Sequence, residues 1–181
     1  MKLSIFNPFT KIAGSKALLI GLGFIIATIV IGYYSNMHFD GAIDAHLKNP
    51  SPILNHALQH LIAWGSVVIL FFLAGLILSR SRFRFIDVAG TIALARAPML
   101  LVAIIGFAPA FQNAIPGQIT NAVLILLIIV IIPTIWMIAL MYHAFIISIN
   151  VKGTKATIGF IISLVLAEIL SISLNQQFLL R

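Results

Sequence analysis

Cysteine is absent from the chain, and acidic residues are scarce. Without cysteine there is no disulfide, no thiolate metal ligand and no cysteine nucleophile. Charged residues make up only 8% of the sequence and hydrophobic residues 61%, whereas a soluble domain is about one quarter charged. Because too little polar surface remains to cover a water-soluble core, the composition indicates a membrane protein rather than a soluble domain.

Long apolar runs predict the fold class. A helix that crosses a bilayer needs about 20 mostly apolar residues, and the runs that meet this condition are residues 16–33, 61–78, 88–109, 119–147 and 156–174. We therefore predict an all-α membrane protein, a bundle of about five transmembrane helices. An N-terminal interfacial arm would occupy residues 1–15, the helical domain residues 16–176 and a short tail residues 177–181.

The distribution of basic residues predicts the orientation, because cytoplasmic loops carry the excess of lysine and arginine. Eight basic residues lie in the arm and in the second and fourth connections, whereas only Lys48 and Arg181 lie on the other side. This asymmetry places the N-terminus in the cytoplasm and the C-terminus outside, in what we expect to be a bacterial inner membrane. The net charge of +7 is then a topology signal, and nucleic acid is not an expected partner.

The third and fourth spans contain residues that disturb a straight helix. Asp87 and Arg96 interrupt the third apolar run, and Pro98 and Pro109 lack the backbone donor that a helix interior needs. We therefore predict that the third span is kinked or lies partly in the membrane interface. The fourth run is too long for a straight crossing, and Pro133 near its middle predicts a bend.

Arg96 and Glu168 are charged residues within predicted spans. A charge in the bilayer centre costs about 2.5–3.5 kcal/mol on insertion scales, so each requires a partner. At a rise of about 1.5 Å per residue, Arg96 lies about 12 Å and Glu168 about 18 Å from the inner boundary, so a bridge between them is reachable. We predict a buried Arg96–Glu168 pair that faces the bundle, with His60 as the alternative partner of Glu168. The pair would be structural or part of a transport or proton pathway, unless Arg96 extends to lipid phosphate instead.

A cluster of histidine and aspartate residues lies in and after the first loop. Four of the five histidines and two of the four acidic residues fall within residues 38–60. His56 and His60 are one helical turn apart, a spacing that can present two imidazoles to a metal ion. Asp40, Asp44 or His46 would complete a site for zinc or another divalent ion. The alternative is an ordinary interfacial cap, since no HExxH signature is present.

Several short motifs lie around the third and last spans. They are Arg82-Phe83-Arg84-Phe85, Asp87-Val88-Ala89-Gly90 and Ala95-Arg96-Ala97-Pro98, followed by Trp136 and Gly153-Thr154-Lys155-Ala156. Together they resemble the bacterial branch of the Yip-domain family, multi-pass membrane proteins named for their interaction with Ypt/Rab GTPases. The resemblance covers roughly residues 60–175. It implies five spans and no established enzymatic activity.

Three classes of function fit these observations. The leading hypothesis is a non-enzymatic membrane scaffold or a protein- or lipid-interaction module, because neither a nucleophile-base spacing nor a phosphate-binding glycine loop is present. Its partners would be the lipid bilayer and a membrane protein or a second copy of the chain, and it would need no cofactor. The alternatives are a metal-dependent intramembrane enzyme built on the His/Asp cluster and a small transporter that uses Arg96 and Glu168.

Overall fold

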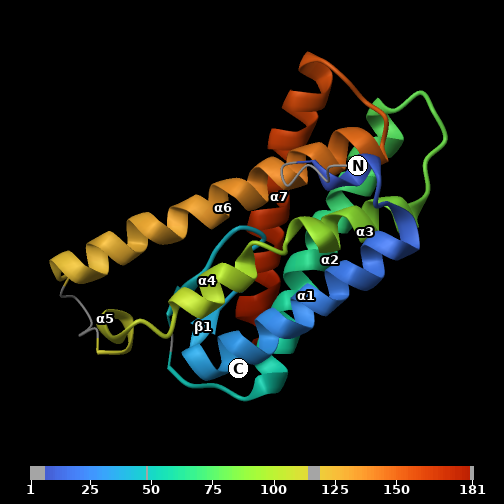
Figure 1. Cartoon of the computed structure of the whole chain (residues 1–181). Helices are drawn as coiled ribbons and strands as arrows, with labels where there is room; N and C mark the ends of the chain where they lie inside the picture. Colours follow the sequence, from blue (N-terminus) through green and yellow to red (C-terminus); the bar gives the residue numbers. More distant parts are fainter. Residues whose placement is uncertain (1–6, 48, 114–118, 180–181) are drawn as a thin grey trace.

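The structure, a computed structural model, describes residues 7–47, 49–113 and 119–179. Four long helices are α1 (Gly14–Ser35), α2 (Ile53–Leu78), α6 (Asn121–Ser148) and α7 (Thr154–Leu179). A further crossing is made by two shorter helices in sequence, α3 (Phe85–Ala95) and α4 (Met99–Ile105). The prediction of an all-α bundle is confirmed, with five helical segments long and apolar enough to cross a membrane (Figure 1).

Four short elements complete the described chain. They are the 3-10 turn η1 (Pro8–Thr10), the strands β1 (Met37–His38) and β2 (His46–Leu47), and α5 (Pro109–Gln112). In the predicted arm, Phe9 is only 2% exposed and belongs to the core, so this part of the arm packs against the bundle. Helix α7 continues beyond the predicted end of the domain at residue 176 as far as Leu179.

The broken crossing α3–α4 lies at the centre of the bundle. In the most apolar 18-residue stretch of this segment, 72% of the residues are buried inside the protein. In the corresponding stretch of α6 the share is only 17%. Helix α1 packs mainly against α3, α2 packs mainly against α7, and α6 runs beside both α3 and α4. The side chains that α6 leaves exposed are largely isoleucine and leucine, which suits contact with lipid.

Small residues allow α1 and α3 to approach closely. A Cβ atom added to Gly90 would overlap the backbone of Gly14 and would lie 2.9 Å from the nitrogen of Leu18. A Cβ on Gly21 would likewise meet the backbone of Ala93 and Leu94. Because backbone atoms cannot rotate away as a flexible side chain can, glycine is required at both contacts.

The kink predicted in the third span is a complete break. Helix α3 ends at Ala95, Arg96 to Pro98 form a turn, and α4 begins at Met99. Proline explains the break, since Pro98 has no N–H to continue the helical hydrogen bonds of α3. Helix α6, in contrast, continues without interruption through Pro133.

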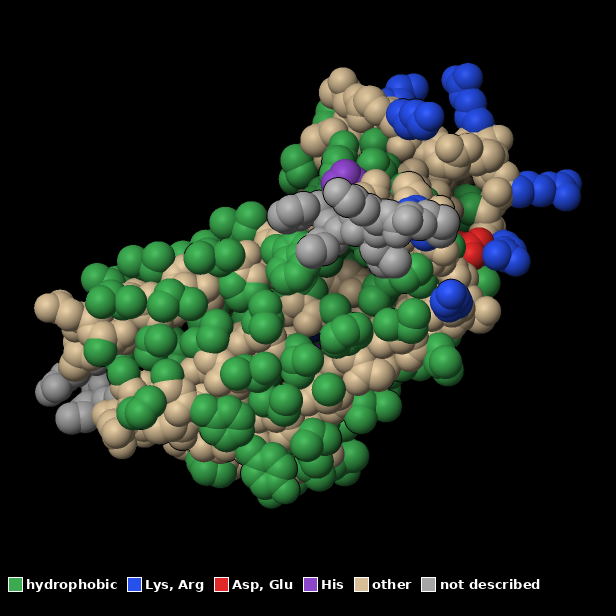
Figure 2. Space-filling view, viewed as in Figure 1, with side chains coloured by type: hydrophobic (Ala, Val, Ile, Leu, Met, Phe, Trp, Pro, Cys, Tyr) green, Lys and Arg blue, Asp and Glu red, His purple; other side chains and the backbone are tan. Residues whose placement is uncertain are grey.

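On the face shown in Figure 2, the lysine and arginine side chains gather at one end of the molecule. At this end lie residues 7–13 of the N-terminal arm, the connection from α2 to α3 and the connection from α6 to α7 (Figure 1). Hydrophobic side chains cover most of the rest of the visible face. This separation of basic and apolar surface is the pattern on which the sequence-based orientation depends.

Candidate functional site in the first loop

The connection from α1 to α2 forms a hairpin that enters the bundle. Helix α1 stops at Asn36, which has a left-handed backbone conformation (φ 53°) that asparagine tolerates better than most residues. Strand β1 then pairs antiparallel with β2, and His38 lies opposite His46. We call residues 37–47 the hairpin. Its Phe39 and Ala42 are at most 1% exposed, so the loop packs inside the protein rather than lying on its surface.

One peptide group of the hairpin is held from both sides by charged side chains. Arg96, in the turn between α3 and α4, donates from Nη1 to the Ala42 carbonyl oxygen at 2.7 Å. The N–H of Ile43, which belongs to the same peptide group, donates to Glu168 Oε2 on α7 at 2.9 Å. The guanidinium and the carboxylate therefore meet the two ends of one peptide dipole, each at the end of opposite partial charge.

Two further contacts fix the tip of the hairpin against α7. Asn175 donates from Nδ2 to the Asp40 carbonyl oxygen at 2.7 Å. A Cβ atom on Gly41 would overlap the Glu168 carboxylate and would lie 2.6 Å from the Cβ of Asp44. Glycine is therefore required at position 41 for the carboxylate to reach the Ile43 N–H.

Helix α2 packs a row of polar and aromatic side chains against the first strand. His38 Nδ1 and Gln59 Nε2 are hydrogen bonded at 2.9 Å, and both residues are buried. The His38 ring lies 4.3 Å from that of His56, and the Phe39 ring lies 4.9 Å from that of His60, between centroids. Both α2 histidines therefore face the hairpin and are at most 2% exposed.

Arg96 and His60 retain unused hydrogen-bonding capacity. Among the described residues, neither ring nitrogen of His60 has a hydrogen-bond partner, and the same holds for Nε and Nη2 of Arg96. Both side chains are only 2% exposed. Buried polar groups in folded proteins are nearly always hydrogen bonded, so this part of the bundle is expected to hold ordered water.

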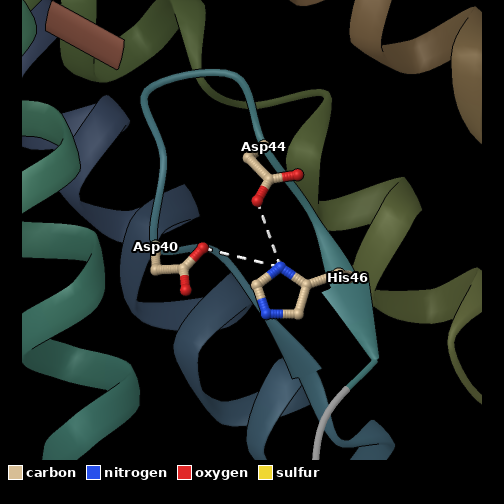
Figure 3. A group of neighbouring side chains, drawn as sticks. All are labelled: Asp40, Asp44 and His46. Atoms are coloured by element: carbon tan, nitrogen blue, oxygen red, sulfur yellow. Dashed lines mark hydrogen bonds and ion pairs between the residues drawn. The ribbon is translucent and has the colours of Figure 1, made fainter. Parts of the chain in front are cut away.

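Asp40, Asp44 and His46 form a cluster in the hairpin, and all three are partly buried (Figure 3). Nδ1 of His46 lies 3.5 Å from Asp40 Oδ1 and 3.1 Å from Asp44 Oδ2. One ligand atom from each residue lies within 4.8 Å of the others. Chiefly through its hydrogen bond, His46 holds the pKa of Asp44 below its ordinary value, although burial acts in the opposite direction. We call these three residues the Asp–His cluster.

The structure thus brings together part of each predicted site. The Asp–His cluster contains three of the five predicted metal ligands, and His56 and His60 are not members of it. Those two histidines instead form the buried wall behind the hairpin. Arg96 and Glu168 both reach the Ala42–Ile43 peptide, and the described ion pairs do not include a direct bridge between them.

Sequence analysis missed Gln59, Asn175 and Gly41. Gln59 lies between His56 and His60 in sequence and is buried with them, so its polar character in an apolar helix was an available signal. Asn175 near the end of α7 carried the same signal. For Gly41 the sequence offered no signal. Glycine is needed there because of the contact with Glu168 on α7, which is 127 residues further along the chain.

Five helical segments long and apolar enough to cross a membrane are the features of an integral membrane protein. Comparisons of the chain with protein-family models, curated proteins and solved structures find no match. Membership of the Yip-domain family therefore remains a prediction from the motifs alone.

Proposed function

We propose that the protein is a non-enzymatic integral membrane protein whose bundle presents the hairpin as a preformed binding site. The observation that carries this proposal is the Ala42–Ile43 peptide, held between Arg96 and Glu168. Placing two charged side chains within spans costs free energy. Here both side chains bind the hairpin and hold it in place. Preorganising a loop lowers the entropy lost when a ligand binds, which is the advantage such an arrangement offers.

The proposed location is a bacterial inner membrane, with the N-terminus in the cytoplasm and the hairpin and C-terminus on the outer side. The collection of basic side chains at one end of the molecule supports this orientation (Figure 2). The hairpin then faces the periplasm. At the cytoplasmic end, the Arg80–Arg84 connection is available to anionic lipid headgroups, each basic residue contributing about 1 kcal/mol.

The scaffold role is supported by the resemblance to the Yip-domain family. Its motif Ala95-Arg96-Ala97-Pro98 coincides with the turn from which Arg96 reaches the hairpin. The motif is thus placed where it shapes the central crossing and holds the binding loop. The partner would be a membrane protein or a second copy of the chain, together with the surrounding bilayer.

A metal-dependent membrane enzyme is the second candidate, favoured by the Asp–His cluster. Catalytic zinc sites keep three protein ligands and one position open for water, and the cluster offers three donors. Zinc-dependent hydrolysis of lipid esters or peptides by the purified protein would favour the enzyme. Zinc binding without such turnover favours the non-enzymatic function.

Hydrogen exchange of the hairpin in lipid nanodiscs tests the proposed binding function. In the wild-type protein the Ile43 amide should be protected, because it donates to Glu168. Gly41→Ala places a Cβ against that carboxylate and should accelerate exchange about tenfold or more, since a hydrogen bond to a charged group contributes about 1.5–3 kcal/mol. Gly23→Ala is the matched control, because a Cβ there meets no atom within 4 Å.

Free exchange of the Ile43 amide in the wild-type protein would contradict a preformed site. Equal exchange in the Gly41→Ala and Gly23→Ala variants would show that Glu168 does not hold the hairpin. Either result rejects the proposed function.

A further inference from the structure

We propose that Asp40, Asp44 and His46 bind one divalent transition-metal ion of the zinc class. This inference rests on the proposed function, because the site is on the same hairpin, and it names the ligand. The metal would be held by one carboxylate oxygen from each aspartate and by Nδ1 of His46 (Figure 3).

The spacing of the donor atoms fits tetrahedral coordination. Bonds of about 2.0–2.1 Å to nitrogen and oxygen place neighbouring ligands of a tetrahedral zinc ion about 3.3 Å apart. Nδ1 of His46 lies 3.1 Å from Asp44 Oδ2 and 3.5 Å from Asp40 Oδ1. These two separations match that value, and the oxygens of Asp40 and Asp44 lie within 4.8 Å of each other.

The identity of the donors selects the class of metal. Calcium and magnesium favour oxygen ligands only, whereas imidazole together with carboxylate suits zinc and similar transition metals. The chain has no cysteine, so sites based on thiolates are excluded. Three protein ligands leave the fourth position of a tetrahedral ion to water or to a group on a partner.

The negative charge around the Asp–His cluster also favours binding of a cation. Three of the four acidic residues of the chain converge here, because Glu168 on α7 lies near enough to Asp44 for the two charges to repel. A carboxylate oxygen of Asp40 lies within 4.8 Å of one of Asp44. Their side chains are only 18% and 40% exposed, so water screens the repulsion incompletely. A divalent ion would offset both aspartate charges.

The ligands are held in place before any metal binds. His46 is fixed by the pairing of β1 with β2, and its ring stacks on that of His38 at 6.2 Å between centroids. His38 is in turn hydrogen bonded to Gln59. Asn175 binds the Asp40 carbonyl, and Gly41 packs on Glu168 between the two aspartates. Such supporting contacts commonly orient metal ligands.

Binding should change the tautomer of His46. Nδ1 must carry a hydrogen to donate to the two carboxylates, and a metal ion at Nδ1 requires that hydrogen to be on Nε2 instead. A metal bound only by surface carboxylates would not require this change.

Titration with zinc chloride tests the site. The full chain is purified without a polyhistidine tag, treated with chelator and placed in nanodiscs before the titration. We expect one zinc ion per chain and a higher melting temperature with zinc. His46→Ala and Asp44→Asn should each weaken binding by at least about 10–100-fold, the cost usual for groups that only support metal ligands. His143→Ala is the control, since His143 lies outside the cluster.

Absence of zinc binding by the wild-type protein would overturn the metal site. The same conclusion would follow if His46→Ala and Asp44→Asn both left the zinc affinity unchanged, or if His143→Ala weakened it as much as they do. Asp44→Asn nearly preserves the size and shape of the side chain, so it separates loss of a ligand from loss of the fold. Hydrogen exchange distinguishes the two proposals: a protected Ile43 amide without zinc binding rejects the metal and keeps the preformed hairpin. An unprotected amide rejects the binding function itself.

Discussion

At the scale of single residues, Arg96 and Glu168 show how a membrane protein can accommodate charges without pairing them directly. Each binds one end of the Ala42–Ile43 peptide, which transmits the interaction between them. Hydrogen bonds in such a chain polarise one another and are stronger together than alone. The arrangement offsets the cost of burying both charges and fixes the loop at the same time.

Replacement of Arg96 should be far more damaging than replacement of an exposed arginine. Arg96→Met leaves the buried Ala42 carbonyl without its donor and removes the positive charge near Glu168. Breaking a buried charged contact costs about 3–5 kcal/mol. Arg84→Met, in which an exposed pair with Asp87 is lost, should cost about 0–1 kcal/mol.

Unfolding of the two variants in mixed micelles, followed by circular dichroism along an SDS titration, gives the comparison. Equal losses of unfolding free energy in Arg96→Met and Arg84→Met would show that the buried contact contributes nothing special.

The lowered pKa of Asp44 predicts a loss of stability in acid. Its ordinary pKa is 3.8, and the hydrogen bond from His46 lowers the pKa in the folded protein. The carboxylate therefore contributes stability above pH 3.8, and this contribution is lost as the pH falls through the lower folded value. Asp40 and Glu168 also face this carboxylate and respond to acid, so the effect must be isolated by substitution.

Comparison of wild type with Asp44→Asn isolates that contribution. The difference in unfolding free energy between them should be constant near neutral pH and should shrink in acid. A difference that stays constant or grows as the pH falls below 3.8 would contradict the role assigned to the His46–Asp44 hydrogen bond.

At the scale of helices and loops, apolar length was enough to predict the five long apolar helical segments, because spanning helices satisfy their own backbone and need only a sufficiently long apolar run. The break after Ala95 was also predictable, since proline acts locally. The insertion of the hairpin was not. Residues 37–47 are polar enough to suggest a surface loop, and their partners Arg96, Glu168 and Asn175 lie far away in sequence.

The metal ligands were predicted only in part for a related reason. The spacing of His56 and His60 correctly indicated that both lie on one face of a helix. That face packs against the aromatic and imidazole rings of the first strand, whereas the two aspartates cluster with His46 of the second strand. How the loop folds against α2 depends on contacts that are distant in sequence, which the spacing alone did not establish.

The close contact between α1 and α3 makes Gly90 a sensitive position. Gly90→Ala would place a Cβ on the backbone of Gly14 and Leu18 and should destabilise the bundle by about 1–3 kcal/mol, the usual cost of overpacking. Gly65→Ala, where a Cβ meets nothing within 4 Å, should be neutral or slightly stabilising because alanine favours helix. Thermal melting in nanodiscs provides the measurement, and a Gly90→Ala protein as stable as Gly65→Ala would show that the helices are not this close.

At the scale of the whole molecule, the bundle is polarised along its length. Basic connections gather at one end (Figure 2), and the hairpin with its acidic residues enters from the other, beside the end of α7. In a membrane this polarity favours one orientation, with the basic end in the cytoplasm. Access of the Asp–His cluster to a metal ion or partner outside the cytoplasm depends on that orientation.

Labelling of single introduced cysteines in intact cells tests this central claim directly, because the chain has no cysteine of its own. Asn49→Cys follows the hairpin and Lys152→Cys precedes α7, and both positions are exposed. A maleimide that cannot cross the inner membrane should label position 49 in intact cells and position 152 only after the membrane is permeabilised. Labelling of position 152 in intact cells, with position 49 shielded, would contradict a hairpin site that faces outward from a five-span membrane protein.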